Sequence, residues 1–381
     1  MLSPYERLLL SYLGKQPDQI TVAIPPFPVL GVPKLEMSAD RANPNFLQWD
    51  KETRIRKSIE FNVNFAKRFP DLCVLDGIGS GGHGDKSLHL AQILAPKLGR
   101  KVFFKESSRG GYTYSKPLIE DLSTFNTDEL YIPDLSKEPD LERVLEGVEM
   151  RLELEDVAYA DLEEHVANGV KGWASTRCVE DIIDQGLVSY RQFLIGMKLW
   201  PDKIHKLCEV TTEYVIEQLK HLEGVMGKIT KLSIADHCTT FMSWKQAEEF
   251  WVPYVRRVNE AFRGAIHIYH NEGQIIHLAG LILKAGFDVY QVGPETDLVE
   301  FREVVGNKLA LFGNIDPVYT LPSGTPEEVE DACKQAITKG SLEGGFILST
   351  GGGPPRNGAP LRNLEAMIKS AEKYGKYSLS A

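Results

Sequence analysis

The amino-acid sequence predicts an α/β protein, a (β/α)8 TIM barrel with an irregular N-terminal extension. Two observations support this prediction. Five strand patterns alternate with five helix patterns through the second half of the chain, at intervals of about 20 to 36 residues. Several of these strands end in polar side chains, and the carboxyl ends of all strands in a barrel converge on one site.

Each unit of the second half joins a short apolar strand to an amphipathic helix. Thr325 and Pro326 are typical of the N-cap and the first position of a helix. Repeated units of this kind imply parallel strands with right-handed crossovers, and an open doubly wound sheet is the alternative to the barrel. The strands are predicted at 229–238, 265–273, 287–294, 309–317 and 345–353, and the helices at 243–262, 274–286, 296–306, 325–340 and 361–375.

The first half of the chain is less regular. Residues 24–33 contain four prolines, which favour extended or turn backbone, either as a surface wrap or as a lid. We expect two parts: residues 1–69 as an arm and helices packed on the barrel, and residues 70–381 as the barrel itself. The remaining predicted elements are strands at 72–77 and 101–107 and helices at 51–69, 85–98, 141–155, 179–199 and 201–225.

Composition excludes several classes of protein. The formal net charge of −10 and the absence of a basic, aromatic-interleaved patch argue against nucleic-acid binding. Five widely spaced cysteines without a CxxC pair indicate a reducing compartment. No apolar stretch is long enough for a membrane helix, and the N-terminus does not resemble a signal peptide. We therefore expect a cytoplasmic protein without a membrane partner.

The stretch AIHIYHNEG at residues 265–273 provides the first candidate site. It ends in His270 and Glu272, two residues apart on one face of a strand. At the end of the preceding predicted strand, alternation puts Asp236 and Cys238 on one side and His237 on the other, and the sequence does not choose between the sides. We assign catalytic roles to Glu272, His270 and Asp236, substrate contacts to His237, Asn314 and Gln291, and metal ligation to His270, Glu272 and Cys238.

A glycine-rich loop at residues 77–84 offers a competing interpretation. Gly77, Gly79 and Gly82 form a G-x-G-x-x-G pattern between a predicted strand and a predicted helix, and Glu106 ends the next strand. Such glycines let backbone amides approach a pyrophosphate. A nucleotide-binding α/β protein is therefore one alternative, and an ordinary barrel loop explains the same residues.

From about residue 160 to its end, the chain resembles the uroporphyrinogen decarboxylase superfamily. The segments that carry the resemblance include GNIDP at 313–317, GTPEEVEDACKQAI at 324–337 and ILSTGGGPP at 347–355. The resemblance implies a (β/α)8 barrel and one of two activities. Decarboxylases of the family grip a polycarboxylate with an N-terminal arginine motif, and the stretch TVAIPPFPVLGVPKLEM has no arginine. The other branch comprises corrinoid-dependent methyltransferases.

In that methyltransferase branch the resemblance implies a zinc site made by a His-x-Cys strand end and a second cysteine in the loop after the last strand. His270 matches the histidine, but Glu272 stands at the first cysteine position and the last loop has only Gly351, Gly352 and Gly353. Both thiolates of the usual site are absent. An oxygen and nitrogen ligand set suits action on an oxygen rather than on a thiol.

Our first hypothesis is therefore a methyltransferase that moves a methyl group from a small methylated compound, a methyl ether (aryl ethers included), to a separate cobalamin-binding protein. The cobalamin is expected on the partner because the chain has no Asp-x-His-x-x-Gly motif. Zinc is the expected metal, and without a metal Glu272 would protonate the leaving oxygen. The alternatives are a decarboxylase-like lyase that acts on a polycarboxylate and the nucleotide-binding protein described above.

Overall fold

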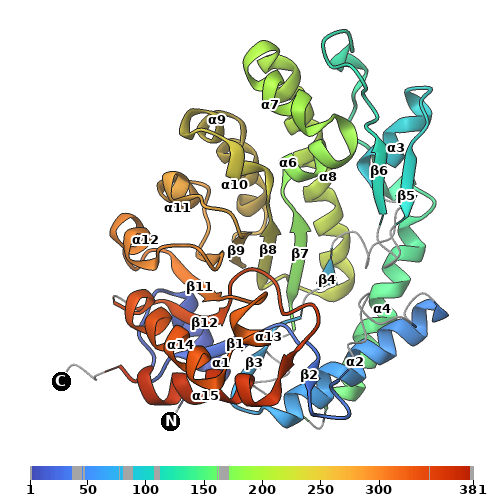
Figure 1. Ribbon diagram of the computed structural model, residues 1–381. Helices are drawn as coiled ribbons and strands as arrows, with labels where there is room; N and C mark the ends of the chain where they lie inside the picture. Colours follow the sequence, from blue (N-terminus) through green and yellow to red (C-terminus); the bar gives the residue numbers. More distant parts are fainter. Residues whose placement is uncertain are drawn as a thin grey trace.

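The computed structural model describes residues 2–36, 45, 48–76, 78–79, 89–106, 112–160, 162, 171–342 and 344–377 (Figure 1). Within this part of the chain, nine parallel strands form one sheet in the order β3-β1-β12-β11-β10-β9-β8-β7-β4. In that order the strands are β3 (Leu72–Val74), β1 (Thr21–Ile24), β12 (Phe346–Thr350), β11 (Ala310–Ile315), β10 (Val289–Val292), β9 (Ile266–Asn271), β8 (Lys231–Ala235), β7 (Trp173–Arg177) and β4 (Ile78–Gly79).

The sheet curls into a TIM-barrel-like arrangement of eight strand positions. β3 pairs with β1 at one end of the sheet, and β4 pairs with β7 at the other end. Only three residues separate β3 from β4 in the sequence, so one stretch of chain, 72–79, accounts for both edges. The predicted α/β barrel is confirmed.

Apart from α1, the principal helices lie outside the curled sheet (Figure 1). Their apolar faces and the outer face of the strands form the larger hydrophobic cluster. The principal helices are α1 (Pro4–Tyr12), α2 (Lys51–Arg68), α3 (Leu90–Lys97), α4 (Leu141–Ala158), α6 (Val179–Ile182), α7 (Tyr190–Leu199), α8 (Pro201–Met226), α9 (Trp244–Phe250), α10 (Val252–Ala261), α11 (Ala279–Lys284), α12 (Leu298–Val305), α13 (Thr320–Ser323), α14 (Pro326–Gly340) and α15 (Leu361–Tyr374). None of the helices in the described ranges is long and apolar enough to cross a membrane.

A second, smaller cluster fills the inside of the barrel. Leu8 and Tyr12 of α1 pack there against strand residues such as Trp173, Ile268 and Phe312. These strand residues define which side chains of each strand point inward, because successive side chains alternate between the two faces. Along each strand, every second residue from these inward-facing residues also points inward, and this identifies the inward side chains at the carboxyl ends of the strands.

Three strands differ from the sequence prediction. β1 lies in the barrel between β12 and β3, although it belongs to the segment expected to pack on the outside. β7 falls between the helices predicted at 141–155 and 179–199, where no element was predicted, because its sequence WASTR mixes small and polar residues. β5 (Phe103–Glu106) was predicted at 101–107, but it pairs antiparallel with β6 (Tyr112–Lys116) in a separate hairpin.

This hairpin weakens the nucleotide-binding alternative. A dinucleotide fold needs the strand that ends at Glu106 to run parallel to the strand before the glycine-rich loop. Instead, among the described strands, β5 pairs with β6 alone, and the pairing is antiparallel. Of the loop itself, only residues 78–79 belong to the described part of the chain, and Gly77 and Gly82 lie outside it.

The proline-rich segment continues from β1 across the carboxyl end of the barrel. β2 (Val29–Leu30) pairs in parallel with β13 (Ala359–Pro360), which follows the last barrel strand. Val29 is fully buried and its amide donates to the carbonyl of Leu35 at 2.6 Å. This segment is therefore built into the structure as a short strand and turn.

Candidate metal centre

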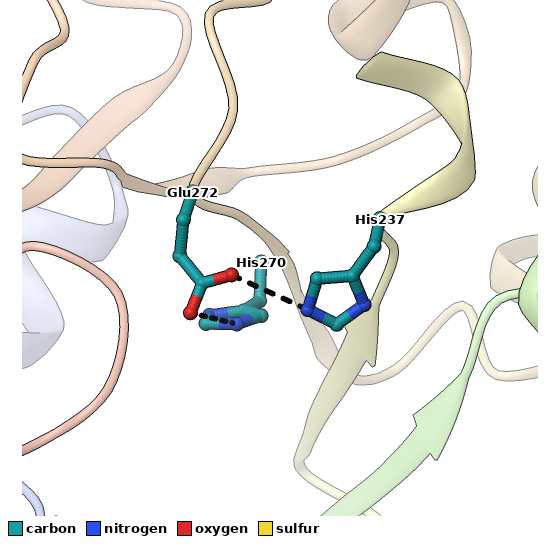
Figure 2. A group of neighbouring side chains, drawn as sticks. All are labelled: His237, His270 and Glu272. Atoms are coloured by element: carbon teal, nitrogen blue, oxygen red, sulfur yellow. Dashed lines mark ion pairs between the residues drawn. The ribbon is translucent and has the colours of Figure 1, made fainter. Parts of the chain in front are cut away.

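Three side chains meet at the carboxyl ends of two neighbouring barrel strands: His237, His270 and Glu272 (Figure 2). His237 follows β8, His270 lies in β9, and Glu272 comes directly after β9. β9 is the element predicted at 265–273, and alternation from the inward-facing Ile268 puts both His270 and Glu272 on the inner face.

The donor atoms of the three side chains lie within 4.8 Å of one another. Glu272 bridges the two imidazoles, with its Oε2 3.3 Å from Nε2 of His237 and its Oε1 3.7 Å from Nε2 of His270. The two imidazole rings are 5.9 Å apart and nearly perpendicular. Because zinc–nitrogen and zinc–oxygen bonds measure about 2.0–2.2 Å, donor atoms around one ion sit about 3.3 Å apart. The cluster is close to that spacing.

A buried carboxylate orients His237. Asp181 of α6, only 1% exposed, accepts a bond of 2.9 Å from Nδ1 of His237. Its other oxygen accepts the backbone amides of His237 and Cys238 at 3.0 and 3.1 Å. With Nδ1 engaged, Nε2 is directed at Glu272. A histidine whose second nitrogen is held by a carboxylate is the usual arrangement in zinc sites.

In the metal-free state this arrangement favours the imidazolium. The hydrogen bond to Asp181 and then the one to Glu272 raise the pKa of His237 to about 10. Reciprocally, the hydrogen bond from His237 holds the pKa of Glu272 below its usual range. A metal ion and a proton therefore compete for Nε2 of His237.

An amide orients His270. Nδ1 of His270 lies 2.6 Å from Oε1 of Gln291, and Nε2 of Gln291 donates to the carbonyl oxygen of Gly352 at 2.7 Å. Because the amide nitrogen of Gln291 is used for that carbonyl, its oxygen accepts, so Nδ1 of His270 carries the proton. The lone pair of Nε2 is then free on the side of Glu272.

Glycines at the last strand allow Glu272 to occupy its position. Gly352 has φ +85°, and a Cβ there would lie 2.5 Å from Cγ of Glu272. Gly293, after β10, also packs against the backbone of Glu272 so closely that a side chain would not fit. The loop 351–353 contributes no ligand, but its lack of side chains makes room for the carboxylate.

The structure places the other predicted site residues elsewhere. Asp236 is fully buried, and it accepts hydrogen bonds from the backbone and hydroxyl of Thr239 and from the hydroxyl of Tyr269. Burial raises its pKa to about 6. Cys238 is 1% exposed and burial raises its pKa. Neither residue joins the cluster found among the described residues.

Asn314 and Gln291 have different surroundings. The Nδ2 of Asn314 donates to the carbonyls of Pro294 and Thr296 at 3.3 and 3.2 Å, so the side chain ties β11 to the loop after β10. Gln291 touches the cluster through His270. Asp181 was missed by the sequence analysis because it lies in a stretch predicted as plain helix, directly after the unpredicted strand β7.

The fold and the cluster together define an α/β barrel protein with two histidines and one glutamate at the mouth of the barrel. The model for the family described as uroporphyrinogen decarboxylase (URO-D) matches residues 93–374 of the chain. The chain belongs to this family.

Its relatives include transferases of methyl groups. A methylated-thiol–coenzyme M methyltransferase from Methanosarcina mazei is 27% identical over 174 residues, which are 45% of this chain and 45% of that protein. A methylcobamide:CoM methyltransferase from Methanosarcina acetivorans is 28% identical over 134 residues, 33% of this chain and 36% of that protein. The matched stretch thus spans less than half the length of these relatives. Uroporphyrinogen decarboxylases match over a similar share of the chain.

A solved structure supports the fold over nearly the whole chain. A methyltransferase from Methanosarcina mazei superposes with a TM-score of 0.69 at 16% identity and covers 98% of this chain and 99% of that one. At this identity the likeness concerns the fold. Since both decarboxylases and methyltransferases are among the relatives, the choice between the two activities depends on the site.

Proposed function

We propose that this protein is a corrinoid-dependent methyltransferase that moves a methyl group from a small methyl ether to a cobalamin-binding partner protein. The single observation that carries the proposal is the ligand set at the barrel mouth: two imidazoles and a carboxylate, each directed toward the others. A decarboxylase of a polycarboxylate needs several cations there to hold the substrate, whereas these three side chains are of the kinds that ligate a metal ion.

The chain's own residues hold the ligand set in place. Asp181 and Gln291 each engage Nδ1 of one histidine, which leaves the two Nε2 atoms facing Glu272. The site therefore fits a divalent metal with nitrogen and oxygen ligands, such as zinc. When bound, such an ion supplies Lewis acidity to the ether oxygen as that oxygen takes up the electron pair of the breaking methyl–oxygen bond.

The absence of thiolate from the cluster favours an ether over a thiol. Thiolate-rich sites suit thiol substrates because soft ligands leave less Lewis acidity on the metal. Glu272 replaces such a ligand with a harder one. The relatives named for thiol and coenzyme M chemistry therefore indicate the kind of reaction, while the ligand set of this chain indicates a different methyl donor.

Exposed apolar side chains around the mouth support a protein partner. Phe241, which follows β8, is 65% exposed, and Val318 and Tyr319, which follow β11, are 61% and 74% exposed. Apolar side chains exposed around a site are typical of a surface that another protein covers. A corrinoid carried by that partner would face the metal centre.

Elemental analysis and a methyl-transfer assay together test the proposal. We expect about one zinc per chain, lost in His237→Ala, His270→Ala and Glu272→Ala. His277→Ala is the matched control, because His277 contacts the carbonyl of Met242 and not the cluster. With reduced cobalamin as acceptor, the zinc-loaded protein should form methylcobalamin from a panel of methyl ethers. Zinc that is retained in all three ligand variants, or methylation from thioethers only, would overturn the proposal.

A further inference from the structure

A second polar cavity lies beside the metal centre, at the carboxyl end of β7. It has a volume of about 370 Å³, and its lining includes Arg177, Asp184, Tyr190, Lys116 and His89. Ligand pockets for small molecules start at about this size. The metal centre uses none of these residues, and the sequence analysis singled out none of them.

The register of the sheet places this cavity next to the cluster. Arg177 pairs with Ala235 of β8, and Ala235 pairs with His270 of β9. Arg177 is four residues beyond the inward-facing Trp173, so it belongs to the same inner face as His270. Since neighbouring strands lie about 4.8 Å apart, the two backbones are separated by about 10 Å.

The α6 segment joins the two sites directly. Asp181, which holds His237, is three residues before Asp184, which lines the cavity. On the other side, the ring of Tyr190 packs edge-on against Phe241 with 5.4 Å between centroids, and Phe241 follows His237 by four residues. The separation of about 10 Å between the backbones of Arg177 and His270 is comparable to the length of a substituted benzene ring.

The chemistry of the cavity selects an anion. Arg177 is exposed and donates to the side chain of Gln185, and its guanidinium has further donors. Oδ1 of Asp184 and the hydroxyl of Tyr190 are buried and have no hydrogen-bond partner among the described residues. Burial, followed by the charges of Asp181 and Asp236, raises the pKa of Asp184 to about 8, so this carboxyl is largely protonated at neutral pH and can donate.

Of the remaining lining residues, Lys116 is a second cation and the others are apolar or neutral. Val188 and Pro117 line the cavity together with the ring of Tyr190. Burial lowers the pKa of His89 to about 3, so its imidazole is uncharged. A carboxylate at Arg177 with a flat apolar body behind it matches this combination of walls.

We infer that this cavity binds the carboxylate of the substrate, and that the substrate is a methoxy-substituted carboxylic acid of about the size of a benzoate. The inference rests on the proposed function, because the methoxy group would then lie at the His237, His270 and Glu272 cluster. Arg177 is the residue that determines this specificity.

Direct binding tests the inference without any turnover. Zinc-loaded protein is titrated in a calorimeter with the 2-, 3- and 4-methoxybenzoates and with the corresponding uncharged methoxybenzamides. We expect at least one acid to bind more tightly than its amide. In Arg177→Met the acid should lose about 10- to 100-fold in affinity, the effect of removing one charged hydrogen-bond donor, while the amide changes little.

Arg191→Met is the matched control. Arg191 neighbours Tyr190 in α7, is exposed, and does not line the cavity, so its loss changes the net charge nearby without removing a donor. It should bind the acid like the unaltered protein. The inference is overturned if no acid binds at millimolar concentration, if amides bind as tightly as acids, or if the two arginine variants behave alike.

Failure of the proposed function would give a different experimental result from failure of the carboxylate site. If acids bind through Arg177 but no methylcobalamin forms from any of them, the carboxylate site stands and the methyl-transfer reaction is wrong. If methylcobalamin forms from uncharged ethers as readily as from acids, in the unaltered protein and in Arg177→Met alike, the reaction stands and the carboxylate site is wrong.

Discussion

Replacing Gly352 by alanine tests whether the last loop shapes the metal centre. Gly352 has φ +85°, in the left-handed region. A Cβ at this position would lie 2.5 Å from Cγ and 3.0 Å from Oε1 of Glu272. The carbonyl of the same residue accepts the hydrogen bond from Gln291, which orients His270. One added methyl group therefore acts on two of the three ligands.

The magnitude follows from these contacts. Left-handed backbone costs a residue with a Cβ about 1–2 kcal/mol, so the free energy of unfolding should fall by that amount. The contact with Cγ is relieved only if the Glu272 side chain moves away from the two histidines. Disturbing the residues that orient ligands costs about 10- to 100-fold in metal affinity, and displacing a ligand should cost at least as much.

Competition between the protein and a chromogenic zinc chelator measures the metal affinity, and urea denaturation of metal-free protein measures stability. Gly353→Ala is the control, since nothing lies within 4 Å of a Cβ at that position and Gly353 is absent from the positive-φ glycines. We expect Gly353→Ala to bind zinc like the unaltered protein. Equal zinc affinities in the two alanine variants would refute the role of Gly352.

Three further predictions follow from the contacts. In metal-free protein, NMR titration should place the pKa of His237 well above its usual 6.5, and Asp181→Asn should lower it because the main cause of the rise is removed. The pKa of His237 in the folded protein is raised to about 10. The stabilisation from protonated His237 is therefore complete below about pH 6.5 and is lost as the pH rises toward 10. Asp181→Asn should flatten the decline of the urea midpoint over this pH window. Asp236→Ala should lower the free energy of unfolding in urea by more than about 3 kcal/mol, because three buried donors lose their acceptor. A variant that kept its stability and lost only activity would contradict a structural role for Asp236. Leu8→Ala should cost about 2–5 kcal/mol in urea unfolding, because the side chain fills the barrel interior, and a loss below 1 kcal/mol would show that α1 does not close it.

The repeating strand–helix units of the fold could be predicted from the local pattern of apolar residues in the sequence. The five strand–helix units of the second half appear within a few residues of their predicted positions, and α14 begins with Thr325 as N-cap and Pro326 at its first position, as expected. The exceptions are breaks within predicted helices. The helix predicted at 179–199 is interrupted before Ser189, which caps α7 through Gln192, and the helix predicted at 243–262 is split at Trp251.

Only part of the candidate site could be predicted from the local sequence pattern. Alternation along one strand relates His270 to Glu272, because both lie on one face whatever the fold. The choice between His237 and its neighbours Asp236 and Cys238 required knowledge of which face of β8 looks inward. That depends on packing between strands and not on the local sequence.

The sequence by itself determined the α/β class, the barrel units of the second half and the pair His270–Glu272, because each follows from the period of side chains along a single element. Only the tertiary structure decided that β1 completes the barrel, that Asp181 orients His237 and that Gly352 makes room for Glu272. Each of these contacts joins residues 50 or more positions apart in the chain, and no local period encodes such a contact.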